Sequence, residues 1–224
     1  MNQEIIHVYF MPGMAANPSI FEYIKLPERR FKIHWLEWRI PKADDTLESY
    51  AKTMCLEIKE KQVVLVGVSF GGILVQEMSK YIDVRKVIII SSVKTRNELP
   101  RRMKLAKATK AYKLVPTQLL GDIELLAKYA FGETATKRVD LYKKYLSVND
   151  KWYLDWAIEQ IICWTQEEPL PNTIHIHGDK DAVFPHQYVK DCITIKGGTH
   201  VMIINKFKWF NENLPKLILD ENMA

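Results

Sequence analysis

The stretch from residue 65 to 74 reads LVGVSFGGIL, an apolar run followed by a single serine among glycines. Residues 63–68 have the pattern of a strand buried on both faces, and residues 71–82 carry apolar side chains at helical spacing. A hydroxyl at a strand–helix junction requires a sharp, strained turn. Gly67 and Gly71, two residues before and after Ser69, lack the Cβ atoms that would collide across such a turn. We therefore interpret Ser69 as a candidate nucleophile, the alternative being a structural serine that caps the helix.

The length and composition of the chain are those of one globular unit. Its 224 residues can bury a single sizeable core, and a content of 47% hydrophobic and 26% charged residues is ordinary for a soluble protein. The net charge of +5 is small, and Lys and Arg do not gather into one short block. This distribution excludes a basic nucleic-acid-binding arm, so we expect no nucleic-acid partner.

The sequence carries no recognisable targeting signal. The first ten residues, MNQEIIHVYF, lack the basic flank and apolar segment of a secretory signal, and no apolar run approaches the roughly 18 residues of a membrane span. The three cysteines, Cys55, Cys163 and Cys192, are odd in number and widely spaced, which argues against a disulfide framework. We expect a cytoplasmic protein without a membrane span; the sequence leaves its oligomeric state open.

Short apolar runs alternate with helical patterns along most of the chain. This alternation indicates β-α-β crossovers, and so an α/β fold with a mostly parallel sheet of about six strands flanked by helices. The predicted strands are 5–10, 31–38, 63–68, 86–91, 173–177 and 191–196, and the predicted helices between them are 47–61 and 71–82.

The alternation stops between residues 92 and 172, where only helical patterns occur, at 119–132 and 151–164. So long a segment cannot be a bare loop in a compact domain. We predict that residues 93–171 form a helical cap insertion laid over one edge of the sheet. Residues 1–92 and 172–224 then form the core, and the whole chain is one compact unit.

Three segments together resemble the α/β-hydrolase superfamily over nearly the whole length of the chain. Gly67-Val68-Ser69-Phe70-Gly71 fits the nucleophile pattern G-x-S-x-G of that family. The segment 177–185, HGDKDAVFP, is similar to its acid loop, and Gly197-Gly198-Thr199-His200 is similar to its histidine loop. The resemblance implies a catalytic triad of Ser69, Asp181 and His200. Asp179 is the competing acid, and the family pattern alone separates the two.

The resemblance also implies an oxyanion hole. Met11-Pro12-Gly13-Met14 is similar to the family's H-G-x-x segment, with Pro12 in place of the usual histidine. The implied donors are the backbone N–H groups of Met14 and Phe70, so the side chains at these positions matter little. The chain starts on the strand that leads into this segment, which implies a trimmed fold without the two strands that usually precede it.

These features imply a serine hydrolase that cleaves a small carboxylic ester or thioester through an acyl-enzyme on Ser69. Two alternatives remain open: a lyase or C–C bond hydrolase on the same fold, and a non-enzymatic receptor for small molecules. We expect the cap aromatics Trp152, Trp156 and Trp164 to line the acyl pocket. The basic stretch 94–113 is either a solvated helix face or, through Arg101, Arg102 and Lys104, a site for an anionic leaving group.

The remaining histidines give little indication of a metal site. His175 and His177 share a strand face, but no cysteine or carboxylate lies at matching spacing, and His177 is expected to pack beneath the acid loop. His7, His34 and His186 are interpreted as surface or satisfied core residues. We therefore expect neither a metal ion nor a cofactor, and a small acyl compound as the substrate.

Overall fold

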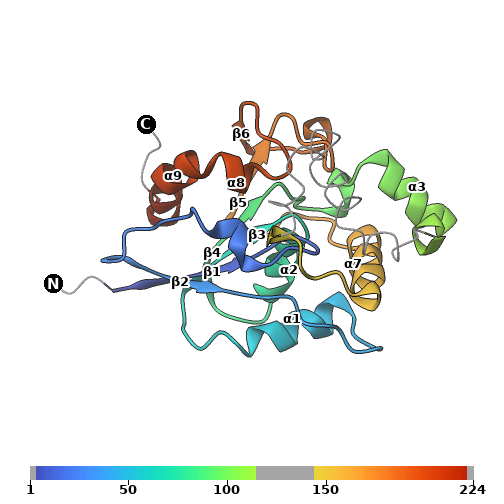
Figure 1. Cartoon of the computed structure of the whole chain (residues 1–224), viewed down its shortest axis with the longest axis horizontal. Coiled ribbons are helices and arrows are strands. Elements are labelled where there is room, and N and C mark those ends of the chain that lie inside the picture. Colours follow the sequence, from blue (N-terminus) through green and yellow to red (C-terminus); the bar gives the residue numbers. More distant parts are fainter. Residues whose placement is uncertain (1–3, 115–143, 221–224) are drawn as a thin grey trace.

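The computed structural model describes residues 4–114 and 144–220, and its centre is one parallel sheet (Figure 1). Six strands pair in the order β2-β1-β3-β4-β5-β6, and every neighbouring pair is parallel. All six residues of β3 are buried, as its unbroken apolar sequence predicts. The strands are β1 (Ile6–Met11), β2 (Phe31–Trp35), β3 (Val63–Val68), β4 (Val84–Ile90), β5 (Thr173–Gly178) and β6 (Ile193–Ile195).

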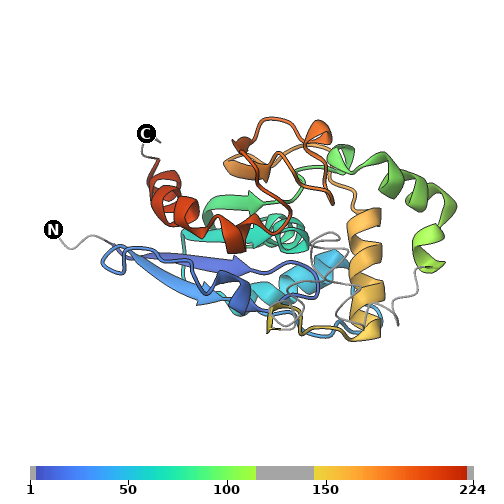
Figure 2. The same cartoon turned by 45° about the horizontal axis from the view of Figure 1, so that its top comes forward.

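Helices cover both faces of this sheet, so the predicted α/β fold with about six strands is confirmed. One face carries α1 (Leu47–Cys55) and α2 (Phe70–Met78), and the other carries α8 (Met202–Asn205) and α9 (Phe207–Leu219) (Figures 1 and 2). The longest described helices have 13 residues. No helix within 4–114 and 144–220 combines the length and the apolar character that a membrane crossing requires.

The sequence patterns located the strands closely but misjudged some helix ends. The pattern for residues 47–61 predicts one helix, whereas α1 ends at Cys55. The N–H groups of Glu57 and Ile58 donate three residues back, to the carbonyls of Met54 and Cys55, so the chain tightens into turns before it enters β3. The amphipathic helix α9 was not predicted, although its inner side packs Phe210, Leu214 and Ile218 in the core.

Between β4 and β5 in the sequence, the described residues include two further complete helices. These are α3 (Arg101–Thr109) and α7 (Lys151–Cys163), and they stand beyond the carboxyl ends of the strands (Figure 2). The short 3₁₀ turns η2 (Arg96–Glu98) and η3 (Ala111–Leu114) flank α3. The predicted helix 119–132 lies outside the described residues, and the limits of the cap insertion at 93 and 171 remain a prediction.

Candidate active site

Ser69 occupies a strained turn between β3 and α2. Its backbone angles are φ 53° and ψ −120°, a region that residues other than glycine rarely adopt. Two close approaches make this turn possible: a Cβ on Gly67 would lie 2.3 Å from the carbonyl oxygen of Gly71, and one on Gly71 would lie 2.3 Å from that of Pro12. The glycines of the G-x-S-x-G pattern are thus required by backbone contacts within the turn and with the loop after β1.

We expect Gly67→Ala to disrupt this turn. The added methyl group would meet backbone atoms of Gly71 and Gly72 at 2.3–2.6 Å, and these cannot rotate away as a side chain could. The expected loss in the free energy of unfolding is about 1–3 kcal/mol or more, measured by denaturant titration. Gly197→Ala is the control, because its Cβ would meet only the Lys206 ammonium at 3.7 Å and the cost there is the strain of φ 66° alone. Equal losses in both variants would contradict the steric argument.

The three residues of the predicted triad come together at the carboxyl ends of the strands. The Nε2 atom of His200 lies 2.9 Å from Ser69 Oγ, and its Nδ1 atom lies 2.9 Å and 3.1 Å from the two carboxylate oxygens of Asp181. Asp181 and His200 are buried, whereas Ser69 is half-buried. The hydroxyl, the imidazole and the carboxylate therefore form one continuous chain of hydrogen bonds.

Asp181 is held as a carboxylate. Its Oδ1 atom accepts hydrogen bonds from the backbone N–H groups of Val183 and Phe184 at 2.8 and 2.9 Å. Burial by itself raises the pKa of Asp181, but the charge and the hydrogen bond of His200, with His177 and the Phe184 N–H, outweigh it and bring the pKa below its usual value. An ionised Asp181 can fix the proton of His200 on Nδ1, which leaves Nε2 free to accept from Ser69.

The competing residue Asp179 has a different contact. Its Oδ1 atom accepts a hydrogen bond of 2.7 Å from the backbone N–H of Gly197, at the start of the histidine loop. Asp179 thus joins the acid loop to the histidine loop, while Asp181 contacts the imidazole itself. These contacts favour Asp181 over Asp179 for the acid position.

His177 packs beneath the acid loop, as expected. Its Nε2 atom lies 2.8 Å from the carbonyl oxygen of Phe184, and its Nδ1 atom lies 3.1 Å from His175 Nε2. Burial lowers the pKa of His177, and this effect outweighs the charge of Asp181, which raises it. A neutral His177 can therefore donate from Nε2 to Phe184 and accept from His175 at Nδ1, so its nitrogens are occupied by protein contacts.

The loop after β1 carries Met14, one of the two predicted oxyanion donors, and passes close to Ser69. A Cβ on Gly13 would lie 3.3 Å from the Ser69 Cβ, so the loop backbone passes close to the nucleophile. Phe70 is the first residue of α2, so its N–H has no acceptor within the helix. The Met14 N–H also has no hydrogen-bond acceptor within the described part of the chain. Both groups stay the predicted donors for an oxyanion.

Two aromatic residues distant in sequence anchor this loop. The indole N–H of Trp38 donates to the Gly13 carbonyl at 2.8 Å, and the hydroxyl of Tyr153 accepts from the Ala15 N–H at 3.3 Å. Tyr153 lies on α7, so the helix of the predicted cap fixes a loop of the predicted core. The sequence contained no signal for either role, since neither residue is near the loop in the chain and neither belongs to a motif.

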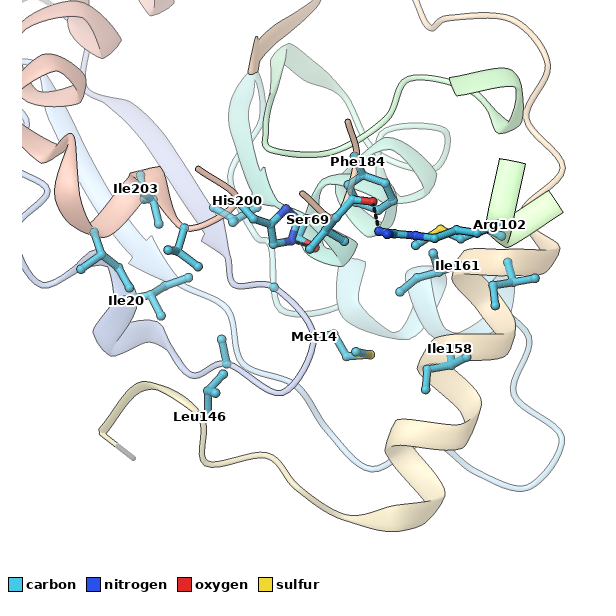
Figure 3. A pocket seen from close by; sticks show the side chains of 18 of the residues that line it. Met14, Ile20, Ser69, Arg102, Leu146, Ile158, Ile161, Phe184, His200 and Ile203 are labelled. Atoms are coloured by element: carbon cyan, nitrogen blue, oxygen red, sulfur yellow. Dashed lines mark hydrogen bonds between the residues drawn. The ribbon is translucent and has the colours of Figure 1, made fainter. Parts of the chain in front are cut away.

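Ser69 and His200 open onto an apolar cavity of about 420 Å³. Ile20, Leu146 and Ile203 lie on one side of the pair in Figure 3, and Arg102, Ile158 and Ile161 lie on the other. The guanidinium of Arg102 donates to the carbonyl oxygens of Ala182 and Val183, both at 2.8 Å. Arg102 thus braces the acid loop from α3, and this role also had no signal in the sequence.

The three tryptophans predicted for the pocket do not line this cavity. Their indole N–H groups are engaged elsewhere: Trp152 donates to the Pro41 carbonyl, Trp156 to the Asp45 carbonyl and Trp164 to the Glu77 carboxylate. The residues of α7 that line the cavity are Ile158, Ile161 and Ile162. The sequence predicted the helical periodicity of α7. It did not predict which side of the helix faces the pocket, because apolar residues occur nearly all round the helix.

The basic residues predicted at the mouth also separate in the structure. Of Arg101, Arg102 and Lys104, only Arg102 lines the cavity, and its Nη2 group donates to the two backbone carbonyls. The ammonium of Lys104 donates to the Asn97 carbonyl at 2.7 Å, and Arg101 is exposed. This arrangement favours the solvated helix face over an anion site for these residues.

Comparison with known proteins gives likeness in structure only. No protein-family profile and no curated protein matches the sequence. A hydrolase from Pseudomonas aeruginosa superimposes with a TM-score of 0.71 at 13% identity, over 96% of this chain and 90% of that one. An enol-lactonase from Burkholderia xenovorans gives 0.70 at 12% identity, over 96% and 92%. A bromoperoxidase from Bacillus anthracis gives 0.63 at 20% identity, over 98% and 94%. With its six-stranded parallel sheet and the predicted serine turn, the chain has the α/β-hydrolase fold.

Proposed function

We propose that the chain is a serine hydrolase that cleaves a carboxylic ester or thioester of an apolar acyl group. One observation carries the proposal: the hydrogen-bonded series Ser69–His200–Asp181 ends in a serine hydroxyl at the wall of an apolar cavity. A structural serine that capped α2 would donate or accept within the helix, but Ser69 makes no side-chain capping bond there. Its hydroxyl is directed to the imidazole instead.

The proposed reaction proceeds in two halves. Nε2 of His200 takes the proton of Ser69 as Oγ attacks the substrate carbonyl, and the N–H groups of Phe70 and Met14 stabilise the oxyanion. The imidazolium then gives its proton to the leaving alcohol or thiol, which departs and leaves an acyl-enzyme. Water attacks this ester with His200 as base, and the carboxylic acid is released as Ser69 regains its proton.

The wall of the cavity indicates the class of substrate. Apart from Ser69, Arg102 and His200, every lining residue is apolar or glycine. Arg102 is the one cationic residue in this wall, and its Nη2 group is held by the carbonyls of Ala182 and Val183. A cavity of about 420 Å³ lies within the usual size range for small-molecule sites. These features support an apolar acyl chain bound beside the nucleophile, and the hydrolase and enol-lactonase with the same fold are compatible with acyl chemistry.

The test is a series of activated acyl esters of increasing chain length, run beside the matching thioesters. Each methylene buried in the cavity should stabilise the transition state by about 0.8 kcal/mol, so kcat/KM should rise about fourfold per carbon until the cavity is filled. Ile158 is half-buried and lines the cavity, so its volume can be changed with little effect on the core. Ile158→Phe should move the optimum to shorter chains and Ile158→Ala to longer ones.

The two Ile158 variants control for each other, because a general loss of stability would lower all rates without moving the optimum in opposite directions. A flat dependence on chain length in the unmodified protein would contradict the apolar acyl site. A single burst of product followed by no turnover would favour the receptor alternative over the enzyme.

A further inference from the structure

A second cluster of chemically reactive side chains lies away from Ser69, near the amino ends of β1 and β3. His7 on β1 and His34 on β2 meet with Nδ1 and Nε2 at 2.9 Å, and Glu60, three residues before β3, places Oε1 at 3.5 Å from His7 Nδ1. All three side chains are half-buried. One ligand atom from each residue lies within 4.8 Å of the other two.

The sheet register explains why these residues meet. His34 is the direct partner of Tyr9 in the parallel pairing of β1 with β2, and His7 lies two residues before Tyr9 on the same face. The loop that follows α1 delivers Glu60 to this face. The Tyr9 ring stacks on His34 with centroids 4.3 Å apart, and His7 and His34 are nearly parallel at 17°. Packing therefore fixes the orientation of both imidazoles.

Tyr9 also fixes the carboxylate. Its hydroxyl donates to Oε2 of Glu60, which leaves Oε1 on the side of the histidines. Tyr9 is buried and Glu60 is half-buried, so this hydrogen bond is partly shielded from water. An outer residue that orients a ligating carboxylate in this way is a common component of metal sites.

We propose that His7, His34 and Glu60 bind one divalent transition-metal ion, with Zn²⁺ as the best match. Two imidazole nitrogens and one carboxylate oxygen are ordinary zinc ligands, and a water molecule would complete the tetrahedron. Ligand atoms bound to tetrahedral zinc lie about 3.3 Å apart, as follows from bond lengths of about 2.0–2.1 Å. The His7–His34 separation of 2.9 Å and the His7–Glu60 separation of 3.5 Å lie on either side of this value, and all three ligand atoms lie within 4.8 Å of one another, so the three side chains have to adjust around the ion.

A metal ion would replace the hydrogen bond that now joins the two imidazoles at 2.9 Å. Each ring would then carry its proton on the nitrogen that faces away from the ion, Nε2 in His7 and Nδ1 in His34. Lys32 on β2 is the direct register partner of His7, so its charge lies beside the cluster and opposes a bound cation. Lys32→Gln should therefore strengthen binding.

The experiment uses the tag-free protein and zinc sulfate alone. We expect one Zn²⁺ per chain by titration calorimetry, and a rise in Tm of about 5–10 °C when free zinc is about one hundred times Kd. Glu60→Gln and His34→Gln should abolish this rise. Tyr9→Phe keeps all three ligands and should weaken binding by about 10–100-fold. Lys32→Gln should tighten it by about two- to fivefold.

His186→Ala is the matched control, since His186 lies near Cys192 Sγ, at 3.8 Å, and could bind zinc adventitiously. The proposal is overturned if zinc leaves Tm unchanged, if Glu60→Gln keeps the full response, or if His186→Ala abolishes it. Each variant is compared with and without metal, so a change in its basal Tm does not affect the result. The outcome is also independent of ester hydrolysis, because no ligand belongs to the site around Ser69.

Discussion

Ser69→Ala is expected to lower kcat/KM for an activated ester by about four or more orders of magnitude, while the unfolding transition stays unchanged. The reason is that the hydroxyl is the only group of the hydrogen-bonded series that can form the acyl-enzyme, and His200 and Asp181 act through it. The lost oxygen is half-buried and makes no capping bond to α2, so the fold needs it little. Steady-state kinetics and a denaturant titration on the same sample measure both quantities.

Ser91→Ala is the matched control. Ser91 is fully buried, also has a positive φ of 48°, and its hydroxyl has no partner within the described ranges. It should keep nearly full activity. A fluorophosphonate probe should label the unmodified chain once, at Ser69, and should not label the alanine variant at all. Labelling of another serine, or activity retained without Ser69, would remove the basis of the proposed function.

The sequence located this site because its chemistry follows strand ends. The glycines around Ser69 and the two loops that carry Asp181 and His200 each come directly after an apolar run. Parallel strands bring their carboxyl ends to one edge, so residues more than a hundred positions apart meet there. Local patterns and this topological rule were therefore enough to predict the six-stranded sheet and the serine turn, whereas the roles of Asp181 and His200 came from the resemblance to the α/β-hydrolase superfamily.

The supporting contacts could not be predicted in this way. Trp38 and Tyr153 each hold the loop of Met14 through one hydrogen bond, and Arg102 holds the acid loop through two, all between segments with no shared motif. The three tryptophans predicted for the pocket, two on α7 and Trp164 directly after it, show the same limit, since none of them lines the cavity. Aromatic and aliphatic stripes both look like core in a periodic pattern, and only the packing of α7 against the loops decides that isoleucines line the cavity.

The second large expected effect is on kcat, and it distinguishes Asp181 from Asp179. In the sequence, only the family pattern separated these two carboxylates. Asp181→Asn should lower kcat by about four orders of magnitude, and Asp179→Asn by no more than about tenfold. Oδ1 of Asp181 accepts from the N–H groups of Val183 and Phe184, so the amide oxygen of asparagine would take that place. Its NH₂ group would then face Nδ1 of His200, where Oδ2 lies at 2.9 Å.

An amide donor at that position requires an unprotonated Nδ1 on His200. The imidazole proton then lies on Nε2, so Nε2 cannot accept the proton of Ser69. Asparagine at 179 has no such effect, since its amide oxygen can still accept from the Gly197 N–H as the carboxylate does at 2.7 Å. The two isosteric variants differ only in which loop position loses its charge, and each is measured by kcat on the same ester. Denaturant titration should show similar stabilities for both. The opposite order of activities would transfer the acid role to Asp179 and displace the proposed contact between loop and imidazole by two residues.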